Sequence, residues 1–385
     1  MTRANPMRRL VLALAPLAIY FACAVYDSSL LVPTDAGADA ASPPDAGGDT
    51  ADPCNHARLP ARPDRDDPGG VDAGELVFAS RTLIFDIDAG GGQTVGYDLD
   101  NFCTCPGPAS CSGPQKTVCD DTRGRDNAAG ALLNKFASYA EAFNPQKIND
   151  RLAAGRIGLV IRVTNYNGTL NDTQIQATVF LSNGIEGFID GGTPTPPQYD
   201  GNDVWTIDPK SLVGGIAPPY IPSSDNVDNA AYVSNGLAVA SLNDIFIDFS
   251  GGAGSAQVRV DLTGVIVTAT LVPNGKGSFD FVEGTLAGRW PTRKLLTSFA
   301  GIHDPLSMDP KQYLCGDSGT YVGLKSLACA QRDIASVVQN DGQNAKCDAL
   351  SFALRFSTSA ARLGSVYSGI APLQPCGPQW ADDCP

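Results

Sequence analysis

The chain has 385 residues, with 27 basic and 41 acidic side chains and a formal charge of −14. This charge excludes nucleic-acid binding by electrostatics, because a polyphosphate partner needs a basic surface. Hydrophobic residues form 43% of the chain and charged residues only 18%, which leaves enough apolar material for a large core. The 41 glycines and 28 prolines favour turns and short strands over long helices.

The N-terminus has the pattern of an export signal. Three arginines precede an apolar run over residues 10–22, which has the length of a secretory signal and is too short for a transmembrane helix. Cleavage by ordinary signal peptidase would release a soluble protein that begins at Val25, whereas cleavage before Cys23 would leave that cysteine for lipidation. Residues 33–53 contain only Pro, Ala, Asp, Gly, Thr and Ser, a composition that predicts an extended, solvated tether.

The start Cys23–Asp27, followed by this Asp/Ala/Pro tether, resembles predicted lipoproteins of large-genome soil bacteria. The resemblance implies a signal peptide over residues 1–22 and a lipidated Cys23 at the start of a disordered tether over residues 23–75. The lipid would hold the protein in the outer membrane or at the cell surface. Secretion as a soluble protein is the alternative.

The remaining ten cysteines predict a disulfide framework, because ten is even and eleven cysteines in one chain indicate an oxidising compartment. They are Cys54, Cys103, Cys105, Cys111, Cys119, Cys315, Cys329, Cys347, Cys376 and Cys384. Five lie before residue 120 and five after residue 314, so at least one disulfide must join the two groups. The four cysteines from Cys103 to Cys119 could instead bind zinc, but their spacings do not suit zinc ligands, and disulfides are favoured.

Residues 76–385 are predicted to be mainly β, from alternating apolar positions and turn residues. Strands are expected over residues 76–88, 95–99, 157–163, 174–181, 204–207, 232–240, 245–249, 257–271, 278–286 and 350–357. Helices are expected over residues 127–143, 148–154, 291–299 and 321–336. The pattern predicts an antiparallel β-sandwich, lectin-like or jelly-roll-like, with helical insertions and a disulfide-stapled cap. A smaller second lobe within residues 291–349 is an alternative.

Paired aspartates are the main candidates for chemistry. The pairs are Asp86 with Asp88, Asp98 with Asp100, Asp200 with Asp203, and Asp244 with Asp248. Such pairs could serve a hydrolase as acid and base or nucleophile. Calcium is the better use of the same oxygens, above all at Asp98 and Asp100, because carboxylates beside flexible backbone carbonyls are the hard ligands that Ca²⁺ takes.

The segment Gly316–Gly319 resembles the loop around the nucleophile in chymotrypsin-like proteases. A serine nucleophile needs a base, and the folded region beyond residue 75 offers only His303 for that role. A turn or helix cap built by Asp317 and Ser318 is therefore the favoured interpretation.

The sequence predicts an exported, lipid-anchored surface protein that binds an extracellular glycan or protein through loops at one edge of its β domain. Its partners would be the membrane, through the lipid, and that ligand, with no nucleic acid. A secreted hydrolase and a structural envelope component are the alternatives. Four aromatic residues in predicted loops could stack on sugars, although most are expected to pack against their own sheets. They are Tyr166, Tyr199, Trp205 and Tyr220.

Overall fold

The computed structural model shows a β-rich unit within Thr50–Pro385. It describes residues 54–85, 94–105, 107–113, 118–137, 143–189, 195–214, 219–249, 258–275, 278–309, 311–368, 375–377 and 380–385. Cys23 and the pair Asp86 and Asp88 lie outside the described residues. No helix in the described ranges is both long and apolar enough to cross a membrane.

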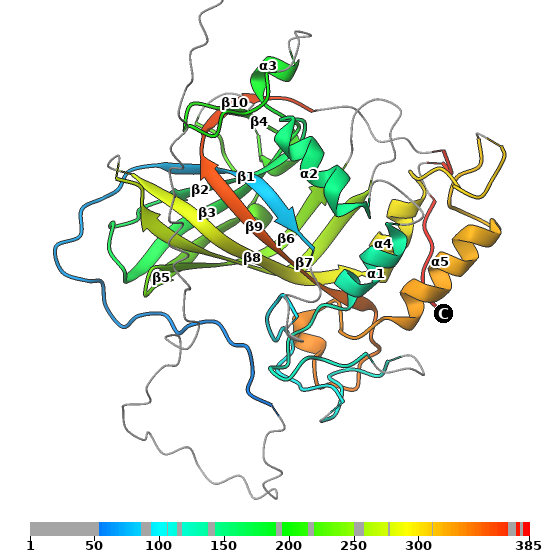
Figure 1. Cartoon of the computed structure of the whole chain (residues 1–385). Helices are drawn as coiled ribbons and strands as arrows, with labels where there is room; N and C mark the ends of the chain where they lie inside the picture. Colours follow the sequence, from blue (N-terminus) through cyan, green and yellow to red (C-terminus); the bar gives the residue numbers. More distant parts are fainter. Residues whose placement is uncertain are drawn as a thin grey trace, which may run out of the picture. The chain divides into compact units, whose positions relative to one another are not determined.

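Eight strands of the described chain close into an antiparallel barrel, in which each strand pairs with the next and the last pairs with the first (Figure 1). These are β1 (Leu76–Ile84), β2 (Gly158–Thr164), β3 (Asp172–Ser182), β5 (Val227–Ser234), β6 (Leu237–Asp248), β7 (Arg259–Pro273), β8 (Phe279–Pro291) and β9 (Ala349–Ala360). The prediction of a mainly antiparallel β fold with helical insertions is confirmed. The two facing sheets of a sandwich are not found, because β1 and β9 pair and close the sheet on itself.

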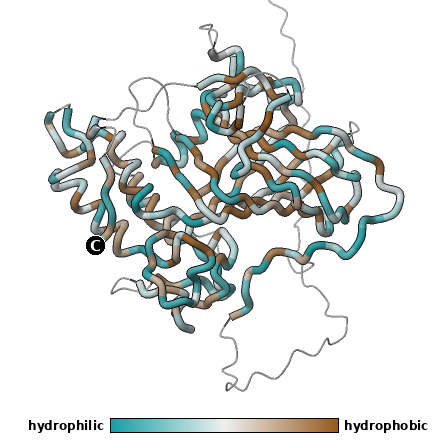
Figure 2. The backbone as a smooth tube through the Cα atoms, turned by 180° about the vertical axis from the view of Figure 1, so that it is seen from behind, coloured by the Kyte–Doolittle hydropathy of each residue, from teal (hydrophilic) through white to brown (hydrophobic). Residues whose placement is uncertain are grey.

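Apolar side chains fill the inside of the barrel. Inward positions alternate with outward ones along each strand, as the period of two requires, and Figure 2 shows this alternation of hydropathy along the strands. A cavity between Ile161, Val267 and Phe356 has a volume of only about 10 Å³. That volume is room for one water molecule at most. The interior of the barrel around Ile161, Val267 and Phe356 is therefore a packed core and not a ligand-binding cavity.

A second, two-stranded parallel sheet packs on the outside of the barrel. It consists of β4 (Val204–Ile207) and β10 (Arg362–Val366). Trp205 of β4 is completely buried in an apolar cluster with Val160 and Phe180, which point outward from the barrel strands. The sequence predicted residues 204–207 as a strand of the antiparallel series and did not predict β10.

Helices cover one end of the barrel (Figure 1). They are α1 (Ala128–Phe136), α4 (Thr292–Phe299) and α5 (Gly319–Ala330), while α2 (Pro145–Ala153) packs on β1 and α3 (Glu186–Ile189) is a short turn before β4. Phe136, Phe143 and Phe299 meet there with ring centroids 5.1–5.9 Å apart. Such tilted and edge-to-face contacts are the preferred arrangements of aromatic rings.

The described elements differ from the predicted ones at three places, one of which turn chemistry explains. The predicted strand over residues 232–240 is two strands, because Asn235 and Gly236 both have positive φ values, 52° and 81°, and form the turn between β5 and β6. Residues 95–99 form a loop and not a strand. The predicted helix over residues 321–336 ends at Ala330.

The described part of the predicted tether is bonded to the rest of the fold: residues 54–57 contact the loops at Asp98 and Arg123, and residues 60–75 lie along the barrel. The Val71 N–H donates to the Asn167 carbonyl over 2.8 Å, and the Tyr232 hydroxyl donates to the Pro60 carbonyl over 2.6 Å. Asp67 accepts the N–H of Asn171 over 2.9 Å. Hydrogen bonds to the barrel therefore fix this segment even though its composition is polar.

Candidate functional site

Five disulfides pair all ten cysteines of the unit. They are Cys54–Cys103, Cys105–Cys119, Cys111–Cys347, Cys315–Cys376 and Cys329–Cys384. Cys111–Cys347 spans a sequence separation of 236 and joins the two cysteine groups, as their odd numbers require. The four cysteines from Cys103 to Cys119 belong to three different disulfides, so they do not form a zinc site. The disulfides are compatible with an exported protein.

The structure brings the two predicted calcium ligands together with a third acid. Carboxylate oxygens of Asp98, Asp100 and Asp126 all lie within 4.8 Å of one another. Asp100 is 4% exposed and Asp126 is 2% exposed. A substrate cannot reach carboxylates that are buried this deeply, so the cluster is suited to holding an ion and not to hydrolysing a glycoside.

Backbone hydrogen bonds hold the three carboxylates in place. The N–H groups of Asn101, Phe102 and Leu99 donate to Asp98, Asp100 and Asp126 over 2.7, 2.9 and 2.7 Å. Asn101 has a φ of 62°, a left-handed conformation that asparagine tolerates and that turns the chain between these acids.

Asp126 is positioned by its neighbour Asn127. The Asn127 side chain caps α1 by accepting the Gly130 N–H over 3.1 Å. The same side chain donates to the Ala353 carbonyl and accepts the Ala353 N–H of β9. The start of α1, and with it Asp126, is therefore fixed to the barrel wall.

Further buried acids surround this cluster. Burial raises the pKa of Asp100 to about 6 and that of Asp120 to about 7. Hydrogen bonds from the backbone N–H groups of Phe102 and Thr104 lower the two pKa values, but burial outweighs them. Burial also raises the pKa of Asp126 well above its ordinary value, and the charges of Asp100 and Asp120 raise it further. Burial raises the pKa of Asp333 to about 7. Burial in the loop region thus favours the protonated form of these carboxyl groups, because it penalises their charge.

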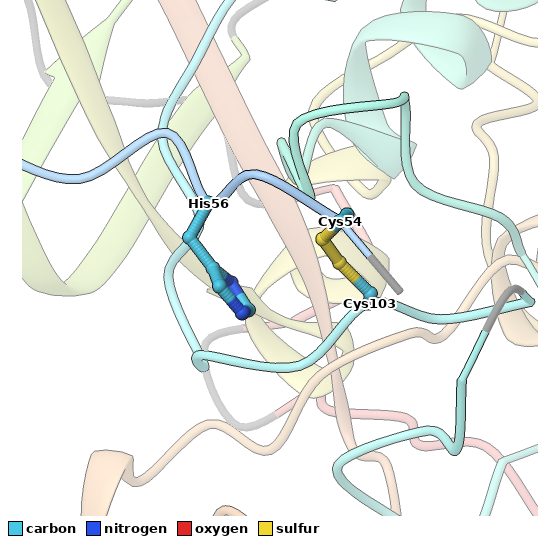
Figure 3. Close-up of side chains that lie close together, drawn as sticks. All are labelled: Cys54, His56 and Cys103. Atoms are coloured by element: carbon cyan, nitrogen blue, oxygen red, sulfur yellow. A yellow bond between two sulfur atoms is a disulfide. The ribbon is translucent and has the colours of Figure 1, made fainter. Parts of the chain in front are cut away.

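His56 lies close to the Cys54–Cys103 disulfide (Figure 3). His56 Nδ1 contacts Asp98 Oδ2. The three side chains could also be viewed as metal ligands, but a metal takes thiolates and not the sulfurs of a formed disulfide. In the oxidised protein these residues therefore anchor the N-terminal segment to the loop that contains Asp98 and Cys103.

A polar pocket of about 410 Å³ opens on the barrel surface where β1, β8 and β9 meet the loop around Tyr199. Arg81 and Asp280 bring opposite charges to its lining. Ser357 and Ser359 add hydroxyl groups from β9. Its volume lies in the range of small-molecule sites.

A β-bulge directs Arg81 toward this pocket. The register of β1 against β9 shifts between Ser80 and Thr82, so Arg81 is the extra residue. Its guanidinium lies 5.4 Å from the centre of the Tyr199 ring. Tyr199 has a φ of 55°, and Asp203 holds this conformation by accepting the Tyr199 N–H over 2.6 Å. Left-handed backbone at a bulky residue is uncommon and is concentrated at functional sites.

The serine loop forms a helix cap in which Ser318 is the capping residue, while no capping hydrogen bond of Asp317 is found among the described residues. The Ser318 hydroxyl accepts the Tyr321 N–H at the start of α5 over 3.3 Å and donates to Asp304 over 2.5 Å. His303 packs on the ring of Tyr313 with 4.7 Å between centroids. The geometry therefore supports a cap and not a nucleophile.

Of the other predicted residues, some line the pocket and the rest have structural roles or lie apart from it. Asp203 serves the turn at Tyr199, while Asp200 lines the pocket. Asp244 and Asp248 both lie on β6, where Asp244 is exposed and Asp248 is half-buried. Of the aromatic candidates, Tyr166 and Trp205 are buried, Tyr220 is half-buried and donates to a backbone carbonyl, and Tyr199 lines the pocket.

Asp126 and the pocket were not predicted from the sequence. Asp126 is 26 residues from Asp100 along the chain, and no local pattern links the two. A comparison of the chain with known protein families, curated proteins and solved structures finds no match.

Proposed function

We propose that the chain is an exported protein that a lipid on Cys23 anchors to the outer membrane or cell surface, and that it binds an extracellular glycan in the pocket between Arg81, Tyr199 and Asp280. The observation that carries the ligand-binding part is the pocket of about 410 Å³, which is concave, polar and bordered by an aromatic ring. The ten paired cysteines and the tether composition support export.

The pocket suits a glycan better than a protein surface. A sugar presents hydroxyl groups around its ring, and these need both donors and acceptors, which Arg81, Asp280 and Ser357 supply. Tyr199 adds an aromatic side chain against which the apolar face of a sugar can pack. A protein partner would use a flatter and larger area than this concavity.

The binding proposal is tested by screening the mature full-length protein, in detergent, against a glycan array. Arg81→Gln and Asp280→Asn are each expected to lower the affinity for the bound glycan by roughly 10- to 100-fold. Each substitution removes a charged hydrogen-bonding group, whose contribution to binding is about 1.5–3 kcal/mol. Arg65→Gln and Asp64→Asn are the matched controls, because both residues are exposed and neither lines the pocket.

Thermal melting of each variant shows whether the fold is intact. An array without any bound glycan would contradict the proposal, and so would equal losses of affinity in Arg81→Gln and Arg65→Gln.

A further inference from the structure

The acidic cluster around Asp98, Asp100 and Asp126 has the dimensions of a cation site. Two oxygens bound to one Ca²⁺ at 2.3–2.6 Å lie at most about 5 Å apart. The three carboxylates bring one oxygen each to within 4.8 Å of the others. The spacing thus allows all three to contact one ion.

In the described part of the chain, the cations near the cluster pair with acids other than Asp100 and Asp126. Arg289, which is almost completely buried, pairs with both oxygens of Asp341 over 2.8 and 2.5 Å and donates to the Leu99 carbonyl over 2.7 Å. His56 Nδ1 contacts Asp98. Asp100 and Asp126 have no ion pair with a described cationic side chain. Buried carboxylates without a counter-charge are costly, which favours a bound cation.

Ser110 is a second and independent observation. Its side chain is 1% exposed and its hydroxyl lies beside the Asp100 carboxyl. Among the described residues, this hydroxyl has no hydrogen bond of normal geometry. Buried hydroxyl groups in native proteins nearly always have a partner, so an orphaned one beside the Asp100 carboxyl points to a missing ligand.

We propose that Asp98, Asp100 and Asp126 bind one Ca²⁺ ion, with the Ser110 hydroxyl as a neutral fourth ligand. All four donors are hard oxygen atoms. Ca²⁺ accepts such ligands in irregular geometry, whereas the smaller Mg²⁺ demands a near-ideal octahedron and keeps several waters, so a set of three carboxylates suits Ca²⁺ better. The ion joins the loop around Asp98 to the start of α1. Because the start of α1 is bonded to β9, the ion also fixes that loop to the barrel. This site is separate from the proposed glycan pocket and does not depend on it.

Isothermal titration of CaCl₂ into the EGTA-treated full-length protein tests the site. We expect one ion per chain, with a Kd of about 1 mM or lower, as in other extracellular calcium sites. Asp100→Asn and Asp126→Asn are expected to weaken binding at least about tenfold. Asp64→Asn is the matched control, because it removes one exposed carboxylate elsewhere and should leave the Kd unchanged.

Absence of calcium binding to the wild-type protein would overturn the proposal. Unchanged binding in both Asp100→Asn and Asp126→Asn would overturn it as well. Equal affinity for MgCl₂ would overturn the assignment of calcium.

Thermal melting separates a metal ligand from a merely structural aspartate. Calcium at about 100 times its Kd is expected to raise the Tm of the wild-type protein by roughly 5 °C. In EGTA, Asp126→Asn should melt at or above the wild-type Tm, because it relieves repulsion from Asp98 and Asp100, and calcium should not raise its Tm. A Tm lowered equally in EGTA and in calcium would show that Asp126 only supports the fold. If Asp126→Asn fails to fold, Asp100→Asn provides the same comparison.

Discussion

Replacing both Cys111 and Cys347 with alanine removes the disulfide that ties the loop around Cys111 to the residues just before β9. This bond closes the longest loop of the five, with a sequence separation of 236. In the chain-entropy relation, a cross-link of that length stabilises the folded state by about 5 kcal/mol, and one with the Cys105–Cys119 separation of 14 stabilises it by about 3 kcal/mol. The other four disulfides do not shorten the long loop appreciably, because none of them connects its two halves.

The assay is urea unfolding under non-reducing conditions, followed by tyrosine and tryptophan fluorescence. We expect the Cys111→Ala/Cys347→Ala variant to lose about 2 kcal/mol more free energy of unfolding than Cys105→Ala/Cys119→Ala, which serves as the matched control. A loss in the first variant that is no larger than in the second would refute the reasoning, because the entropy of the long loop would then not be what this bond removes.

Two further substitutions test the packing. Arg289→Met should cost about 3–5 kcal/mol, because it leaves the Asp341 carboxylate without its partner, and addition of Asp341→Leu should restore most of that loss in chemical denaturation. Gly284→Ala should cost about 1–3 kcal/mol, because an added Cβ would lie 2.2 Å from the Phe356 ring inside the barrel. Gly323→Ala is its control and should stabilise α5 by about 0.5–1 kcal/mol, since nothing lies within 4 Å of the added methyl group. Equal Tm shifts for the two glycine variants would contradict this account of the packing.

Local patterns predicted much of the fold. The alternation of Leu350, Phe352, Leu354 and Phe356 indicates one inward face of β9, and all four are buried in the barrel core. The odd number of cysteines in each group required the long-range bond, now identified as Cys111–Cys347.

Closure of the barrel was not predictable in the same way. It depends on the pairing of β1 with β9, in which Phe78 faces Ala360 at a separation of 282 residues. The same alternating strands fit two facing sheets equally well, so the periodicity does not distinguish a sandwich from a barrel. The Asn235–Gly236 turn, by contrast, carries a recognisable hairpin signal and divides the predicted strand at that point.

In the candidate sites too, local sequence patterns predicted some features, while others arise only in the folded state. Asp98 and Asp100 stand two residues apart and were predicted together. Asp126 joins them through tertiary hydrogen bonds, from its own N–H to the Tyr97 carbonyl and from the Leu99 N–H to its carboxylate. The pocket depends on a bulge at Arg81 and on the left-handed backbone of Tyr199. Neither feature has a sequence signature, because both arise from the register and from hydrogen bonds made in the folded state.

Export and lipid attachment are the claims on which the proposed cell-surface function rests, and mass spectrometry of the protein purified from native membranes tests them most directly. We expect a mature chain that begins at Cys23 with a diacylglyceryl group on its sulfur, and ten further cysteines that resist alkylation until they are reduced. An intact N-terminus that still begins at Met1, or cysteines that alkylate without reduction, would contradict it.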